Sequence, residues 1–136
     1  MSIIVTGGCG FIGSNFILHW LSENQEKIIN IDLLTYSGNI KNLDIEKNNK
    51  KLIFIKSDIC DKDLIIQVLS KYNPRAIINF AAETHVDRSI NNAENFVKTN
   101  IFGVFNLLEA ARDYLQGLAK DKKENFRFIH VSTDAV

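Results

Sequence analysis

A glycine-rich turn near the amino terminus contains the residues whose spacing most clearly suggests a chemistry. Gly7, Gly10 and Gly13 read as G-x-x-G-x-x-G, and Gly8, Gly10 and Gly13 also satisfy G-x-G-x-x-G. Glycines in such a turn allow a sharp bend, a close approach of the backbone to a pyrophosphate, and tight packing of the next helix. An apolar run at 3–5 precedes them and helix-spaced residues follow. This context predicts a strand, a turn and a helix whose amino end binds dinucleotide phosphates.

Asp32 is the second chemical signal. It ends an apolar run at 27–31 and lies about twenty residues after Gly13, the spacing of the acid that binds a cofactor ribose. A carboxylate at this position accepts hydrogen bonds from the adenosine 2′-hydroxyl and repels a 2′-phosphate. Alone, an aspartate after a strand is an ordinary turn residue. Together with the glycines it predicts a site for NAD rather than NADP.

The composition excludes several other classes of function. Sixteen basic and sixteen acidic residues balance, which predicts no basic surface for nucleic acid. The first apolar run is short and no later one approaches a membrane span, so we expect no signal peptide, no membrane segment and a cytoplasmic protein. Cys9 and Cys60 are far apart and indicate reduced thiols, with Cys9 a small filler in the glycine turn. No cluster has the spacing of metal ligands, so no metal is expected.

Apolar runs alternate with helix-like stretches along the chain. Strands are predicted at 3–5, 27–32, 51–56, 76–80 and 126–132, helices at 11–22 and 91–115, and a polar connection at 116–125. A further helix, capped by Asp61, is predicted from the apolar stripe of Leu64, Ile65, Val68, Leu69 and Tyr72. This alternation predicts a Rossmann-type α/β fold, a doubly wound parallel sheet in three α/β/α layers. About five strands are present where six are usual, so residues 1–136 are expected to form one incomplete NAD-binding domain.

The long helix predicted at 91–115 carries two apolar flanks. The main stripe, expected to pack on the sheet, consists of Val97, Ile101, Val104, Leu108, Ala111 and Leu115. Phe102 and Phe105 lie beside it. Such width predicts burial on two sides, against the sheet and against another helix or subunit.

In doubly wound sheets, ligands bind beyond the carboxyl ends of the strands. The segments expected there are the glycine turn, 32–35, 58–59, 81–88 and 132–134. The last two are rich in hydroxyls and carboxylates, a mixture that suits a nicotinamide and an oxygen-rich substrate.

With these motifs the chain resembles the extended short-chain dehydrogenases/reductases, and among them most closely the dTDP-glucose 4,6-dehydratase family. The matching stretches are 6–16, 32–39, 58–61, 81–90 and 128–134. The glycine motif is shared by the whole superfamily. The stretch at 81–90 and the Ser-Thr-Asp at 132–134 are much more specific to the dehydratases.

The resemblance implies an NAD site and a nucleotide-sugar site. The implied cofactor-binding residues are Gly7, Gly10, Phe11, Ile12, Gly13, Asp32, Leu33, Leu34, Thr35, Asp58, Ile59, Phe80, Ala81, Ala82, Thr84 and Thr99. Phe11 and Ile12 would contact the pyrophosphate, and Asp58 and Ile59 would border the adenine. The implied partners are dTDP-glucose or a similar nucleotide sugar and, in the full-length protein, a second copy in a homodimer.

The family reaction is an internal redox cycle, in which NAD takes a hydride from C4, water leaves across C5 and C6, and the hydride returns to C6. By resemblance, Thr84 and Thr133 touch the sugar, and Thr133 and Asp134 form the catalytic pair, with Asp134 as the acid that protonates the departing C6 hydroxyl. The family has Glu after Ser-Thr-Asp, the base for the C5 proton. This chain has Ala135, whose methyl group cannot accept a proton.

The family's Tyr-x-x-x-Lys pair and its substrate domain are also absent from the 136 residues. The sequence therefore predicts the amino-terminal portion of a dehydratase that is itself inactive. A sister epimerase or decarboxylase stays open, although Asp134 argues against it, and so does a non-catalytic NAD-binding remnant, which Ala135 favours. Without the resemblance, Thr133 and Asp134 would be ordinary turn residues. His130 is predicted to be a hydrogen-bonded core histidine.

Overall fold

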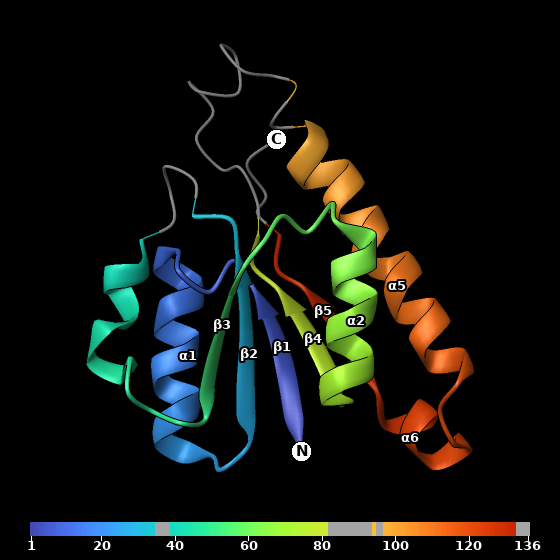
Figure 1. Cartoon of the computed structure of the whole chain (residues 1–136), viewed down its shortest axis with the longest axis horizontal. Coiled ribbons are helices and arrows are strands. Elements are labelled where there is room, and N and C mark those ends of the chain that lie inside the picture. The colour runs from blue at the N-terminus through green and yellow to red at the C-terminus, as the bar shows by residue number, and fades with distance from the viewer. Residues whose placement is uncertain (35–38, 82–93, 95–96, 133–136) are drawn as a thin grey trace.

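The computed structural model describes residues 1–34, 39–81, 94 and 97–132 of the chain. These residues form one five-stranded sheet in which every strand is parallel to its neighbours, in the order β3-β2-β1-β4-β5 (Figure 1). The strands are β1 (Ser2–Thr6), β2 (Lys27–Asp32), β3 (Leu52–Lys56), β4 (Ala76–Asn79) and β5 (Arg127–His130). The predicted doubly wound α/β fold is therefore confirmed.

Helices cover both faces of the sheet. On one face lie α1 (Phe11–Glu23) and the 3₁₀ helix η1 (Ile40–Glu46), and on the other lie α2 (Lys62–Tyr72) and α5 (Val104–Gln116), as Figure 1 shows. A π-helical turn, η2 (Lys98–Gly103), leads into α5, and the short helix α6 (Lys120–Asn125) lies between α5 and β5. The predicted three layers are thus present, while α6 lies in the stretch predicted to be a polar connection.

Two apolar clusters follow from the alternation of side chains along the strands. In β1, Ile3 and Val5 pack on the α1 side, whereas Ile4 packs on the α2 and α5 side. All three side chains are buried, as expected for a strand covered on both faces. The two clusters together fix the sheet between its helical layers.

Helix α2 begins and ends with local signals that the sequence contains. The Asp61 carboxylate accepts a hydrogen bond from the Leu64 amide at 3.2 Å, which confirms the predicted cap. At the other end, Asn73 adopts the left-handed conformation that stops a helix. The helix buries Ile65, Val68 and Leu69 against the sheet.

The predicted stripe of the long helix is largely wrong. Leu107, Ala110 and Ala111 face the core, whereas Ile101 is 60% exposed and Leu108 is 47% exposed. The π turn η2 accounts for Ile101, because a π turn holds more residues than an α turn and rotates its side chains relative to those that follow. A regular α-helical spacing continued through η2 therefore places Ile101 on the face toward the sheet, whereas the structure leaves it exposed. Leu108 lies in α5 itself, where the buried face runs through Leu107 instead.

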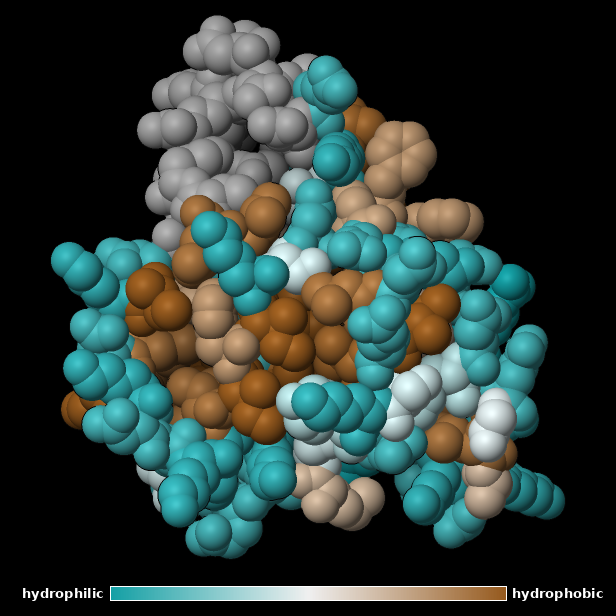
Figure 2. Space-filling model, in the orientation of Figure 1, coloured by the Kyte–Doolittle hydropathy of each residue, from teal (hydrophilic) through white to brown (hydrophobic). Residues whose placement is uncertain are grey.

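Close packing explains why the π turn contains Gly103. A Cβ at this residue would lie within 2.6 Å of Ile59 Cγ1, so the helix can approach the loop after β3 only with glycine here. The outward face of this region then exposes apolar side chains, and hydrophobic colour gathers at the start of α5, at the upper right of Figure 2. The exposed residues are Val97, Ile101, Phe102, Phe105 and Leu108.

Candidate functional site

The crevice between β1 and β4 is the place where this sheet can bind a ligand. The chain winds outward from β1 through β2 to β3 and then returns to β4 on the other side of β1. A sheet of this kind opens a crevice at its switch point, beyond the carboxyl ends of the strands. The segments that follow the strands there are 7–10, 33–34, 57–61, 80–81 and 131–132.

The glycine turn after β1 packs so closely that Gly7 and Gly13 have no room for a side chain. Gly7 has φ +71°, and a Cβ there would lie 2.5 Å from the Ala81 amide nitrogen. A Cβ on Gly13 would lie 2.8 Å from the Gly8 Cα, so α1 rests directly on the turn. Gly10 is different, since its φ of −75° and ψ of 177° suit any residue. The backbone conformation at Gly10 therefore does not itself require glycine.

Helix α1 presents its amino end to the crevice. Gly10 is the cap residue, and no side chain caps the helix or places a negative charge in its first turn. The amide groups and the positive end of the helix dipole are therefore suited to an anion such as a pyrophosphate. Phe11 and Ile12 lie in this first turn and are 81% and 59% exposed.

Asp32 is tied directly to the glycine turn, a contact that the sequence did not predict. Its Oδ2 accepts a hydrogen bond from the Cys9 amide at 2.8 Å, and its Oδ1 accepts one from the Leu34 amide at 2.7 Å. Each carboxylate oxygen keeps further acceptor capacity for the hydroxyls of a ribose. Leu34 has φ +60°, which is rare for a leucine, so the chain after β2 bends sharply around this carboxylate.

Asn30 is a structural residue of the site that sequence reasoning missed. It is fully buried in β2, and its Oδ1 accepts a hydrogen bond from the Gly8 amide at 3.0 Å. A Cβ on Gly8 would lie 2.7 Å from Asn30 Cγ, so this amide also explains the second glycine of the turn. The available signal was an asparagine inside an apolar strand, because a buried amide must find hydrogen-bond partners.

Cys9 is inert, as predicted. Its thiol is fully buried, and burial together with the neighbouring Asp32 carboxylate raises its pKa to about 12. A thiol with this pKa forms almost no thiolate near neutral pH, so it is not a nucleophile.

The loop after β3 carries Asp58 and Ile59, the residues predicted to border an adenine. Asp58 Oδ1 accepts a hydrogen bond from the Cys60 amide at 2.9 Å, and its Oδ2 lies 3.5 Å from Lys98 Nζ. The Ile59 side chain is buried in the core, so only its main chain can face the crevice. Its carbonyl oxygen accepts a hydrogen bond from Asn106 Nδ2 at 2.6 Å.

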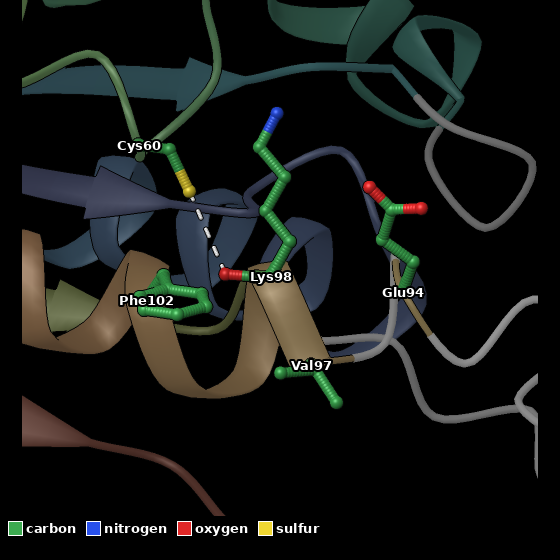
Figure 3. Close-up of a pocket in the computed structure, with 5 residues that line it drawn as sticks. All are labelled: Cys60, Glu94, Val97, Lys98 and Phe102. Atoms are coloured by element: carbon green, nitrogen blue, oxygen red, sulfur yellow. Dashed lines mark hydrogen bonds between the residues drawn. The ribbon is translucent and has the colours of Figure 1, made fainter.

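An open cavity of about 520 Å³ lies beside this loop. Figure 3 shows its five lining residues: the Lys98 and Glu94 side chains point to one side, Val97 points to the other, and Phe102 lies near Cys60. The Cys60 thiol donates a hydrogen bond to the Lys98 carbonyl oxygen at 3.5 Å. The cavity therefore borders the Asp58–Lys98 pair, next to the predicted adenine region.

The exit of β4 forms the opposite wall of the crevice. The Phe80 ring packs against Phe16 of α1, with ring centroids 5.5 Å apart. The Ala81 amide donates a hydrogen bond to Asn79 Oδ1 at 3.1 Å. Thr99 lies half-buried in η2.

The structure brings four predicted segments together at the carboxyl ends of the strands: the glycine turn, Asp32 to Leu34, Asp58 and Ala81. Five predicted site residues lie outside the described residues: Thr35, Ala82, Thr84, Thr133 and Asp134. Ala135 lies outside them as well. His130 is hydrogen-bonded as predicted but is exposed, so its assignment to the core was wrong. The physical reason is that β5 is the edge strand of the sheet.

Two other features are absent from the described residues. Among them, no group of three or more His, Cys, Asp or Glu side chains is placed to hold a metal ion. Within the same part of the chain, no helix has the length and apolar character needed to cross a membrane.

The chain is similar to sugar-nucleotide enzymes over its whole length. A family model described as GDP-mannose 4,6 dehydratase matches residues 4–136. The dTDP-glucose 4,6-dehydratase of Haemophilus influenzae is 49% identical over 136 residues, which cover 100% of this chain and 40% of that protein. The dTDP-glucose 4,6-dehydratase 1 of Escherichia coli K12 is 45% identical over 100% of this chain and 38% of its own length. The chain thus spans about 40% of the length of these curated relatives.

Solved structures agree with the fold. The dTDP-glucose 4,6-dehydratase of Bacillus anthracis, in complex with NAD, has a TM-score of 0.81 and 37% identity, covering 98% of this chain and 38% of that one. The UDP-glucose 4-epimerase of Thermotoga maritima, with UDP-glucose, has a TM-score of 0.79 and 33% identity over the same shares. The family match, the dehydratase relatives and the parallel sheet with its glycine turn lead to one assignment: this chain belongs to the GDP-mannose 4,6 dehydratase family.

Proposed function

We propose that residues 1–136 form the NAD-binding part of a nucleotide-sugar 4,6-dehydratase that converts dTDP-glucose, or a similar sugar, to its 4-keto-6-deoxy product. The observation that carries this proposal is the joining of Asp32 to the glycine turn through the Cys9 amide, at the switch point of the sheet. This contact sets an acceptor for ribose hydroxyls beside an uncapped helix end for phosphates. The relatives at 45–49% identity with the same activity in their names support it.

The described residues fit NAD part by part. The amino end of α1 would hold the pyrophosphate, Asp32 would bind the adenosine ribose, and Asp58 would border the adenine. Phe80 and Ala81 would form the wall opposite the glycine turn. When bound, NAD supplies the hydride acceptor and donor of the dehydration.

The chemistry on the sugar would come from residues outside the described part. Thr84 and Thr133 would contact the sugar, and Asp134 would hold the proton for the departing C6 hydroxyl. Ala135 supplies no base for C5, and none of the three tyrosines has a lysine four positions on. The 136 residues would therefore bind cofactor without completing the reaction.

Calorimetric titration of the chain with NAD and with NADP tests the cofactor assignment. We expect NAD to bind more tightly, because the Asp32 carboxylate would repel the 2′-phosphate of NADP. Equal or tighter binding of NADP would contradict the proposal.

A sister epimerase is the second candidate, since the Thermotoga epimerase matches the fold almost as well as the dehydratase does. A longer protein that carries this segment, with Glu at 135, distinguishes the two reactions when it is incubated with dTDP-glucose. A dehydratase gives a 4-keto product that absorbs in alkali, whereas an epimerase gives the 4-epimer.

We also propose that the exposed face at Ile101, Phe102 and Phe105 binds a second copy of the chain. These side chains lie on one side of η2 and the first turn of α5, and each is about 60% exposed. An exposed apolar face of this kind favours association, and homodimers most often pair one surface with its own copy.

A further inference from the structure

Three polar side chains stand in a row at the crevice, each on the last residue of its strand. Thr6 ends β1, Asn79 ends β4 and His130 ends β5. The strands are parallel and in register, with Thr6 beside Asn79 and Asn79 beside His130. We propose that Asn79 is a positioning residue of the crevice, which fixes the exit of β4 and holds the His130 imidazole in its Nε2–H tautomer.

The orientation of the Asn79 amide is decided by a backbone group. Asn79 is fully buried, and its Oδ1 accepts hydrogen bonds from the Ala81 amide at 3.1 Å and from the Thr6 hydroxyl. Because a backbone N–H can only donate, the side-chain oxygen must face Ala81. The amide nitrogen Nδ2 therefore points the other way, toward β5.

That orientation sets the tautomer of the histidine. Asn79 Nδ2 lies 3.1 Å from His130 Nδ1. An amide NH₂ group can only donate, so Nδ1 must accept and cannot carry a proton. A neutral imidazole has a single N–H, which then resides on Nε2.

The main chain adds to this arrangement. The Phe80 amide donates to the Thr6 carbonyl oxygen at 2.8 Å, and the Val131 amide donates to the Asn79 carbonyl oxygen at 3.0 Å. Asn79 therefore makes hydrogen bonds to the segment that follows β4, and strand β4 is bonded here to β5 on one side and to β1 on the other. All of these contacts lie at the switch point of the sheet. Since Ala81 touches the glycine turn at Gly7, a shift of the β4 exit would change the width of the crevice.

The tautomer can be measured on the chain without any ligand. Long-range ¹H–¹⁵N correlation at pH 8 of protein with ¹⁵N-labelled histidine reports the protonated nitrogen of each ring, and a His130→Gln variant identifies the signal. We expect Nε2–H in the wild type. In Asn79→Asp the side chain can only accept, so the proton should move to Nδ1. The matched Asn125→Asp variant in the exposed helix α6 should keep Nε2–H. A wild type with Nδ1–H, or an unchanged tautomer in folded Asn79→Asp, would overturn the proposal.

Cofactor affinity tests the positioning role, and this part rests on the proposed function. We expect Asn79→Leu, which fills the space but makes no hydrogen bonds, to weaken NAD binding about tenfold or more, while Asn125→Asp leaves it unchanged. Normal NAD affinity in Asn79→Leu would overturn the positioning role alone. Failure of the wild type to bind NAD would overturn the proposed function, and the tautomer measurement would still decide the hydrogen-bond assignment. If Asn79→Leu does not fold, Asn79→Ala takes its place in the same titration, and normal NAD affinity in that variant would overturn the positioning role.

Discussion

At the scale of single residues, Asp32 both orders the backbone around it and is the proposed acceptor for the ribose. The residue is only 8% exposed, and its carboxylate accepts hydrogen bonds from two backbone amides, one in the glycine turn and one at Leu34. A carboxylate held in this way is preorganised, because the contacts that fix the turn also fix its orientation before any ligand binds. Local structure and cofactor choice therefore depend on one side chain.

The first prediction concerns Asp32→Ala. We expect NAD affinity to fall about 10- to 100-fold, because a charge-assisted pair of hydrogen bonds is lost, while NADP affinity changes less. The preference for NAD should narrow, as titration calorimetry of both cofactors would measure. Asp121→Ala, in the exposed helix α6, is the matched control and should keep the wild-type ratio. An unchanged ratio in a folded Asp32→Ala variant would refute the role of this carboxylate.

At the scale of elements, an ion pair joins the residues just before β2 and β4. It lies at the amino ends of the strands, and the crevice lies at their carboxyl ends. Arg75 donates two hydrogen bonds to Glu26, from Nε at 2.7 Å and from a terminal nitrogen at 2.5 Å. This bidentate pair holds the pKa of the Glu26 carboxyl below its usual value, chiefly through the Arg75 hydrogen bond. The guanidinium also lies over the Trp20 ring, 5.9 Å from its centroid, so the pair connects α1 as well.

The second prediction follows from that pKa. A lowered folded-state pKa means that the charged carboxylate stabilises the fold above the unfolded pKa of about 4.3, and that this stabilisation disappears as the pH falls through the folded value. We expect Glu26→Gln to lower the free energy of unfolding by about 1 kcal/mol at pH 7. The difference from wild type should close in strong acid. Urea unfolding at pH 7 and pH 2.5 measures this.

Glu109→Gln serves as the control for Glu26→Gln. Glu109 pairs with Arg112 within one helix at 2.7 Å, and the arginine side chain is 65% exposed. Such surface pairs contribute little, so the control should lie near wild type at both pH values. A Glu26→Gln loss that persists unchanged in acid would contradict the ion-pair explanation.

For the whole molecule, the third prediction concerns association. The exposed apolar face at the start of α5 should drive self-association, which light scattering over a wide concentration range would detect. The double variant Phe102→Glu and Phe105→Glu should shift the mass toward the monomer, because it places charges on that face. Lys120→Glu with Lys122→Glu changes the charge of exposed α6 and should leave the association unchanged. A sharp monomeric mass for the wild type at every concentration would disprove the idea.

The fourth prediction concerns turnover by the 136 residues. Each missing acid or base typically costs 10²–10⁴-fold in rate, and here both the C5 base and the residues that start C4 oxidation are absent. We expect no 4-keto product from dTDP-glucose, and Ala135→Glu alone should not restore it. A longer protein with Glu at 135 should turn over and lose activity again on Asp134→Asn. Turnover by the purified chain itself would overturn this expectation.

Local sequence patterns determined most of the fold. Strand and helix alternation, the Asp61 cap and the spacing of the glycine turn to Asp32 are encoded within short stretches, because each depends on neighbouring residues alone. These predictions therefore agree with the five-stranded parallel sheet and with the position of the turn at the switch point. The roles of Thr84, Thr133 and Asp134 rest on the resemblance and stay predictions.

Only the tertiary structure decided which side chains meet. The π turn before α5 rotates Ile101 away from the sheet, and nothing in the spacing of apolar residues signals that extra rotation. Asn30 and Asn79 lie in apolar runs, and their partners come from segments 22 and 51 residues away. His130 is exposed because its strand lies at the edge of the sheet. Burial and hydrogen-bond pairing between distant segments are properties of the assembled sheet, so the sequence pattern alone cannot specify them.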